Sequence, residues 1–254
     1  ADGLTSVNIA AGAFTDASSN SNTAATEFSW TYNGTPASVS SVALASNNST
    51  IAVTMDKAVY STGGGSGALE TTDFSLAISG GSASLSSATP SSISASGNVY
   101  TLGIGITGTP DGSEVVTVNP VSGSIYDAYG NISTNSQSNN TATLNDQLSP
   151  TVSITAVSSS GDAVSSGSTT NDASIILTLT ASESTSNLAS ADVTVSGGSL
   201  SSFSGSGTTY NVTFTPSASG ATTVDIAASG FTDAAGNNNT AATQFAWTFD
   251  GTEP

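Results

Sequence analysis

Carboxylates and amides are the side chains with which this chain could do chemistry. Its 254 residues include eighteen Asp and Glu, a single basic residue (Lys57), and neither His nor Cys. Histidine-based triads, thiolate nucleophiles and zinc sites built from His or Cys therefore cannot form. Calcium suits this inventory best, because Ca²⁺ takes six to eight oxygen ligands from carboxylates, amide carbonyls and backbone carbonyls.

The same inventory argues against several functional classes. A pair of carboxylates could serve a glycosidase, but that reaction needs a cleft lined by aromatic side chains. Trp30 and Trp247 instead alternate with polar residues, as core positions of strands do. We therefore do not expect an enzyme. The formal charge of −17 offers no basic footprint for nucleic acid, and no run of residues is apolar enough for direct membrane insertion.

A repeated stretch organises the rest of the chain. Residues 231–251 have a second version at residues 14–34, and every matched residue lies 217 positions away. Both versions begin with a polar turn and end in a strand in which aromatic and polar residues alternate. A shorter version of the turn occupies residues 125–131. Repetition of this kind is typical of an array of similar modules.

These copies predict three segments. Residues 1–33 correspond to the last two strands of a module. Two strands cannot bury an apolar face alone, so we expect further chain or another subunit to complete them. Residues 34–149 and 150–254 each show about seven short strands separated by turn signals, with Gly80–Gly81 and Gly197–Gly198 as predicted hairpin turns. The sequence thus predicts an all-β fold of tandem Greek-key immunoglobulin-like β-sandwich domains in an extended array.

In such a sandwich, three segments meet at the pole where the chain enters. They are the incoming linker, the loop between the second and third strands, and the loop before the last strand. In residues 150–254 and their linker, these segments hold Asp146, Glu183, and Asp233 with Asn237. We predict a structural calcium site there. Asp250 repeats the position of Asp146 and is expected to serve a following module.

The middle module holds a corresponding set of oxygen-bearing side chains. Its members are Asn33 in the linker, Asp56 after the second strand, and Asp127 with Asn131 before the last strand. A second interpretation of Asp233 and Asp127 stays open. Both could simply form Asx-turns, with Gly236 and Gly130 supplying the positive φ that such turns use.

The repeated stretch resembles the bacterial immunoglobulin-like repeats of giant secreted surface adhesins, including those exported with calcium-binding RTX tails. The resemblance covers essentially the whole chain. It rests on the turn Phe-Thr-Asp-Ala-Ala-Gly-Asn at 231–237, the strand Thr-Gln-Phe-Ala-Trp-Thr-Phe-Asp at 243–250, and the Asp-containing linker that ends at Pro150. It implies an extracellular, calcium-stiffened fibre of many domains at the bacterial cell surface. The RTX nonapeptide itself is not present.

The predicted function is structural. We expect a repeat segment of an extracellular bacterial surface fibre or adhesin, with neighbouring Ig-like domains as partners and calcium stiffening the junctions. Two alternatives stay open. The middle module could bind a surface glycan or protein through its Gly63–Gly67 insertion. Residues 1–33 could instead complete a sandwich in an adjacent chain by β-strand addition, as part of a fibre or surface layer.

Overall fold

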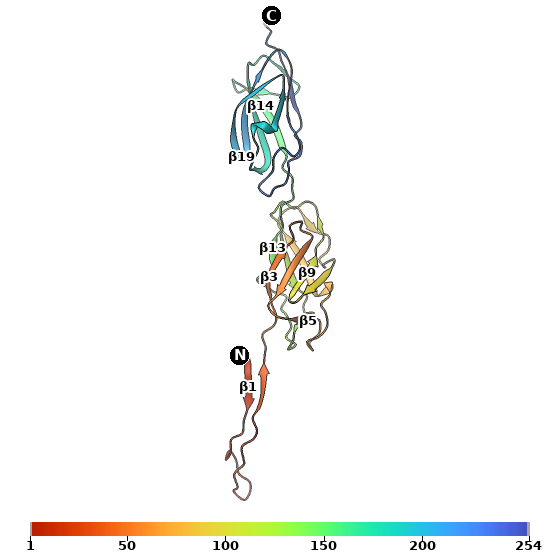
Figure 1. Ribbon diagram of the computed structural model, residues 1–254, viewed down its shortest axis with the longest axis vertical. Coiled ribbons are helices and arrows are strands. Elements are labelled where there is room, and N and C mark those ends of the chain that lie inside the picture. The colour runs from red at the N-terminus through yellow and green to blue at the C-terminus, as the bar shows by residue number, and fades with distance from the viewer. Residues whose placement is uncertain (1, 253–254) are drawn as a thin grey trace. The chain divides into compact units, whose positions relative to one another are not determined.

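The computed structural model describes residues 2–252 (Figure 1). Residue 1 and residues 253–254, at the ends of the first and last predicted segments, lie outside the described residues. The described chain consists of strands, turns and two short 3₁₀ segments, without an α-helix. The prediction of an all-β fold is confirmed, whereas the tandem array remains a prediction. Contacts divide the chain into unit 1, residues 1–108 and 112–144, and unit 2, residues 109–111 and 145–254.

Unit 2 is a sandwich of two four-stranded sheets. The first has the order β15–β14–β17–β19, formed by Ala163–Val164, Val152–Ser158, Ile175–Thr185 and Gly198–Pro216. The second has the order β16–β21–β20–β18, formed by Thr169–Thr170, Phe245–Phe249, Gly220–Ile226 and Val193–Ser196. Pairing is antiparallel except between β16 and β21, which run parallel.

Strict alternation of apolar and polar residues builds the core of unit 2. Leu177 and Leu179 of β17 are fully buried, while Thr178 between them is half-buried on the opposite side of the strand. From the other sheet, Trp247 of β21 meets Phe214 of β19 edge to face, with ring centroids 4.6 Å apart. Both sheets therefore contribute one apolar side to a single core.

Unit 1 contains a second sandwich with shorter strands. One sheet has the order β3–β4–β9–β8, formed by Val39–Leu44, Thr50–Met55, Val99–Gly103 and Ile93–Ser96. Another has the order β13–β11–β6, formed by Thr141–Thr143, Val115–Pro120 and Phe74–Ser79. Two small pairs complete it: β5 (Val59–Tyr60) with β12 (Tyr126–Asp127), and β7 (Ser84–Leu85) with β10 (Ile106–Thr107).

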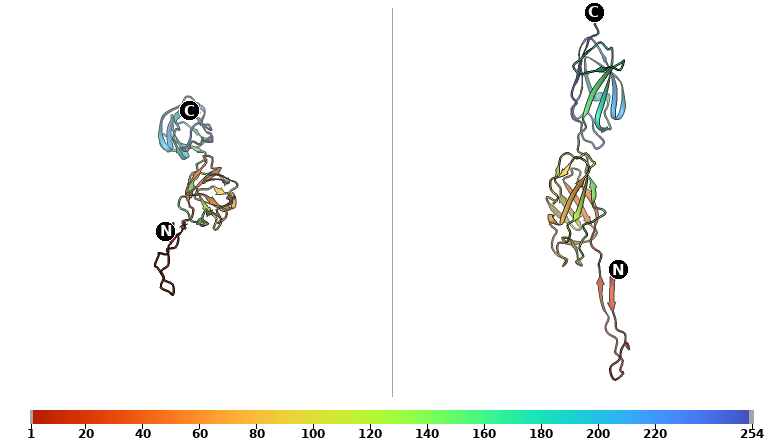
Figure 2. Two further views of the ribbon diagram at one scale, coloured as in Figure 1. Left: turned by 60° about the horizontal axis from the view of Figure 1, so that its bottom comes forward. Right: turned by 180° about the vertical axis from the view of Figure 1, so that it is seen from behind.

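An antiparallel hairpin, β1 (Gly3–Val7) and β2 (Phe28–Tyr32), precedes this sandwich. Its register repeats that of β20 and β21, since Thr5 pairs with Trp30 as Thr222 pairs with Trp247. No other described strand pairs with it, and Figure 2 shows the same two strands from two further sides. Its large apolar side chains are exposed: Leu4, Val7, Ile9, Phe14, Phe28, Trp30 and Tyr32.

The two predicted glycine hairpin turns are wrong. β18 pairs with β20 whereas β19 pairs with β17, so at Gly197 the chain crosses from one sheet to the other. Likewise β6 pairs with β11 and β7 pairs with β10, on either side of Gly80–Gly81. Gly197 has a φ of 78°, and a Cβ there would lie 2.6 Å from the carbonyl oxygen of Ala221. The glycines permit a tight crossover instead of a hairpin.

Candidate metal centre

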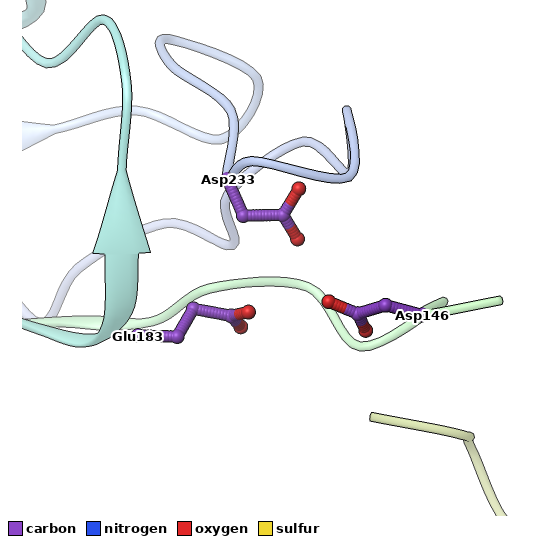
Figure 3. A group of neighbouring side chains, drawn as sticks. All are labelled: Asp146, Glu183 and Asp233. Carbon is purple, nitrogen blue, oxygen red and sulfur yellow. The ribbon is translucent and has the colours of Figure 1, made fainter. Parts of the chain in front are cut away.

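Three carboxylates from separate segments gather at one end of unit 2 (Figure 3). Asp146 lies in the linker before β14, Glu183 near the end of β17, and Asp233 in the loop between β20 and β21. One oxygen of each lies within 4.8 Å of the others, and residues 2–252 contain no second group of this kind. The fold thus brings together the three carboxylates that the sequence proposed for this module. We call these side chains, with Asn237 and the segments that carry them, the entry pole of unit 2.

Local hydrogen bonds explain the position of Asp233. Its Oδ1 accepts from the backbone N–H groups of Gly236, over 2.7 Å, and Asn237, over 2.9 Å. Its Oδ2 accepts from Nδ2 of Asn237 over 2.8 Å. Gly236 has the positive φ, 95°, that the predicted Asx-turn requires. A bridge to Thr185 then fixes this loop beside the end of β17.

The linker is held by a second set of bonds. The carboxylate of Asp146 accepts from the N–H of Leu148 over 2.8 Å, and its carbonyl oxygen accepts from Nδ2 of Asn237 over 3.3 Å. Asn237 therefore ties the loop to the linker through its amide nitrogen. Whether Asn237 also gives its oxygen to a metal ion stays a prediction.

Glu183 is the electrostatically strained member of the group. Its Oε1 is buried and has no hydrogen-bond partner. Burial, followed by the negative charges of Asp146, Asp233 and Asp111, raises the pKa of Glu183. Sequence reasoning missed Asp111, because it precedes the linker by many residues and only the folded contacts place residues 109–111 with unit 2.

Asp233 shows the opposite shift although it is buried. Burial acts to raise the pKa of Asp233, but the hydrogen bonds from Asn237, Gly236 and Ala235 outweigh it, and its pKa lies below the ordinary value. The entry pole of unit 2 therefore holds the ionised carboxylate of Asp233 beside the carboxylates of Asp146 and Glu183, whose negative charges repel it. The donor spacing fits calcium, because two oxygens each 2.3–2.6 Å from one ion are at most about 5 Å apart.

The corresponding residues of unit 1 form the same turn. Oδ1 of Asp127 accepts from the N–H groups of Tyr129, over 2.9 Å, and Asn131, over 3.0 Å. Nδ2 of Asn131 donates to Oδ2 of Asp127 over 2.9 Å and to the carbonyl oxygen of Asn33 over 3.0 Å. The structure therefore brings Asn33, Asp127 and Asn131 together.

Asp56 directly follows β4, as the sequence indicated, and it bonds to the residue before β3. Its Oδ1 and Oδ2 accept from N, over 2.9 Å, and Oγ, over 3.1 Å, of Ser38. In the strand register, Val39 opposite Met55 corresponds to Val152 opposite Ala181. Two residues further on, unit 1 therefore has Lys57 where unit 2 has Glu183, and Asp56 corresponds in register to Ser182. Calcium binding by this set stays a prediction.

Asp250 repeats the turn of Asp146. Its Oδ1 accepts from N of Thr252 over 3.1 Å and from Oγ1 over 2.6 Å. These bonds hold the pKa of Asp250 below its ordinary value. Its predicted role toward a following module stays a prediction.

One comparison with known protein families agrees with the sandwich architecture of unit 2. No curated protein matches the chain. No helix able to span a membrane occurs among the described residues. Domains of the bacterial Ig-like type are typically exposed at the cell surface and are in general not catalytic. Residues 146–248, which contain all three carboxylates, match the family model described as a bacterial Ig-like domain, and this match supports a domain of that family in unit 2.

Proposed function

We propose that this chain is a structural segment of an extracellular bacterial surface fibre or adhesin, and that calcium fixes the incoming linker at the entry pole of unit 2. The family match supports a structural surface module. One observation carries the calcium: the buried Oε1 of Glu183 has no hydrogen-bond partner and lies among other carboxylates. A buried anion without a hydrogen-bond partner is costly, and a bound cation would offset that cost.

Calcium would act as a cross-link between three parts of unit 2. Asp146 would bring the linker, Glu183 the end of β17, and Asp233 the loop before β21. Without an ion, the carboxylates repel one another. Asp146 is then joined to the Asp233 loop by the 3.3 Å bond from Nδ2 of Asn237 to its carbonyl oxygen. Calcium would therefore stiffen the point where the chain enters the domain.

Thermal unfolding of the full chain, with calcium and with EGTA, tests this function. A ligand bound only by the folded state stabilises it by about 3–4 kcal/mol at several hundred times Kd. We expect calcium to raise the unfolding temperature of unit 2, and Glu183→Gln and Asp146→Asn to abolish the shift. Asp162→Asn, in a loop outside the carboxylate group, is the matched control. Identical curves with calcium and EGTA would remove calcium from this function.

A binding role for unit 1 is a second candidate. The Gly63–Gly67 loop lies against residues 126–130, since a Cβ on Gly65 would be 3.2 Å from the carbonyl oxygen of Ala128. Beside it, Tyr129 is 62% exposed and Ile132 is 48% exposed. An exposed tyrosine next to a polar loop suits a glycan or protein ligand. Binding to a glycan array that Tyr129→Ser abolishes would support this role, and an array without signal would oppose it.

Assembly with another chain is a third candidate, favoured by the uncovered β1–β2 hairpin. In unit 2 the equivalent strands are covered by the sheet of β14, β17 and β19. We propose that strands of that type, from the same polypeptide or an adjacent one, cover β1 and β2. Sedimentation of the full chain tests whether an adjacent polypeptide supplies these strands. Self-association that Phe28→Ser reduces would support this source, and a monomer at all concentrations would exclude self-assembly.

A further inference from the structure

The Asp-x-x-x-Asn turn occurs three times, and the three copies have two hydrogen bonds in common. In the uncovered hairpin, Oδ1 of Asp16 accepts from N of Asn20 and Oδ2 accepts from Nδ2 of Asn20, both over 2.9 Å. The same pattern holds at Asp127 and Asp233. Because the turn forms at Asp16, which belongs to no group of three carboxylates among residues 2–252, the turn alone does not indicate a metal ion. The differences between the copies lie in what surrounds them.

One strand position carries side chains of opposite charge in the two sandwiches. In unit 1, the N–H of Asp56 donates to the carbonyl oxygen of Ser38 over 2.9 Å. In unit 2, the N–H of Ser182 makes the equivalent bond to the carbonyl oxygen of Thr151, also over 2.9 Å. The next residue is Lys57 in unit 1 and Glu183 in unit 2. The single basic side chain of the sequence therefore stands where unit 2 has its unpartnered carboxylate.

Lys57 holds the linker of unit 1 directly. Its Nζ donates to the carbonyl oxygen of Thr35 over 2.8 Å, while Nδ2 of Asn131 donates to the carbonyl oxygen of Asn33 over 3.0 Å. The charge of Lys57 also reaches Asp127. Burial acts to raise the pKa of Asp127, but hydrogen bonds from Asn131 and Tyr129, together with that charge, lower it. We call these side chains and residues 33–35 the entry pole of unit 1.

We propose that this position selects the cation of each pole: Lys57 supplies unit 1 with a built-in ammonium, whereas Glu183 makes unit 2 require a divalent metal ion. The second half rests on the proposed calcium function. In unit 1 the ammonium binds the linker, at the carbonyl oxygen of Thr35, and offsets the charge of Asp127. Binding the linker and offsetting carboxylate charge are the two tasks assigned to calcium in unit 2. This proposal replaces the expectation of calcium at Asn33, Asp56, Asp127 and Asn131.

The two cations differ in chemistry. A lysine ammonium is a covalently attached point charge with three donors, and it is strongly hydrated. It stays in place when free calcium falls, and its positive charge repels a metal ion from the same oxygens. Unit 1 is therefore expected to keep its linker fixed without calcium, while unit 2 releases its linker.

Hydrogen exchange of the full chain, read by mass spectrometry with calcium and with EGTA, tests the proposal. In the unaltered chain we expect calcium to slow exchange about tenfold in residues 231–239 and less than about twofold in residues 125–133. Lys57→Glu adds a carboxylate to the unit 1 pole, and exchange in 125–133 should become calcium-dependent. Glu183→Lys should protect 231–239 equally with calcium and with EGTA. Residues 14–22, which carry the third turn, are the internal control.

The possible results separate the two proposals. Calcium protection of 125–133 in the unaltered chain would overturn the role of Lys57 and leave calcium at unit 2 intact. An absence of calcium protection at 231–239 would remove the calcium function of unit 2. Lys57→Met would then decide whether Lys57 is the built-in cation of unit 1. In EGTA, faster exchange of 125–133 in Lys57→Met by about tenfold supports the built-in cation, and unchanged exchange refutes it. Lys57→Met also serves if Lys57→Glu fails to fold.

Discussion

Two hairpins with nearly the same sequence have opposite surroundings. Trp247 in β21 is 3% exposed, whereas Trp30 in β2 is 41% exposed. Strand pairing is the same in both, down to the threonine opposite each tryptophan. The period-two pattern therefore determines which side of a hairpin is apolar, but the strands that cover this side come from elsewhere in the fold.

The turn inside each hairpin is built by the same local hydrogen bonds. Oδ1 of Asn239 accepts from N of Phe231 over 2.9 Å, and its Nδ2 donates to the carbonyl oxygen of Ala227 over 2.8 Å. In the uncovered hairpin, Asn22 makes the equivalent bonds over 3.0 and 2.9 Å. The turn thus forms with or without a core beneath it, and burial changes only how much its loss costs.

The largest expected difference concerns the two tryptophans. Trp247→Ala leaves a cavity beside Phe214 and is expected to destabilise unit 2 by about 3–5 kcal/mol. Trp30→Ala removes an exposed side chain and should change the stability of either sandwich by less than about 0.5 kcal/mol. Calorimetry of the full chain measures both. Equal losses would mean that β1 and β2 are covered in solution, and the comparison would then fail.

A smaller difference is expected at the two asparagines of the turns. Asn239→Ala leaves the buried N–H of Phe231 and the part-buried carbonyl oxygen of Ala227 without this partner, at a cost of about 1–3 kcal/mol to unit 2. Asn22→Ala exposes the same groups to water, so unfolding of both sandwiches should be unchanged. Urea denaturation gives the free energies, and an effect of Asn22→Ala on the unit 1 sandwich would contradict the local nature of its turn.

The smallest expected difference is in the response to pH without calcium. The raised pKa of Glu183 means that the folded state binds this proton more readily than the unfolded chain, whose ordinary pKa is 4.5. Unit 2 should therefore gain stability as pH falls from 7 toward 4.5, and lose it as pH rises through the raised pKa. Glu183→Gln should flatten this part of the profile, and saturating calcium should reverse it.

The uncovered hairpin should respond in the opposite sense. Hydrogen bonds from Asn20 hold the pKa of Asp16 below its ordinary value of 3.8. Protection of this turn is therefore present above pH 3.8 and lost as pH falls through the lowered pKa. Hydrogen exchange across this range measures the loss, and Asp16→Asn should remove the pH dependence without altering unfolding of either sandwich.

Local patterns predicted much of this molecule. The alternation around Trp247 gave a buried strand, and the spacing of Asp233, Gly236 and Asn237 gave the turn that carries a candidate ligand. Both depend on residues near one another in sequence. Topology then placed Asp146 and Glu183 beside that turn, as the Greek-key arrangement indicated.

The failures concern relations between distant strands. Gly80–Gly81 and Gly197–Gly198 have the composition of hairpin turns, but strand pairing makes them crossovers between sheets. The register between β3 and β4, with its irregularity between Val39 and Ser41, places Lys57 at the position that Glu183 has in unit 2. A shift of one residue reverses the charge at that point, and spacing within one strand does not reveal it.

The parallel pairing of β16 with β21 has a mechanical consequence. Thr248 and Asp250 donate their N–H groups to the carbonyl oxygens of Ser168, over 2.8 Å, and Thr170, over 2.9 Å. β21 leads directly to the carboxyl end of the domain, so a pull on that end slides β21 lengthwise along β16. Such sliding loads these bonds together, in shear, and they cannot open one after another as in a peeled hairpin. Tension along the chain is thus resisted by several bonds at once.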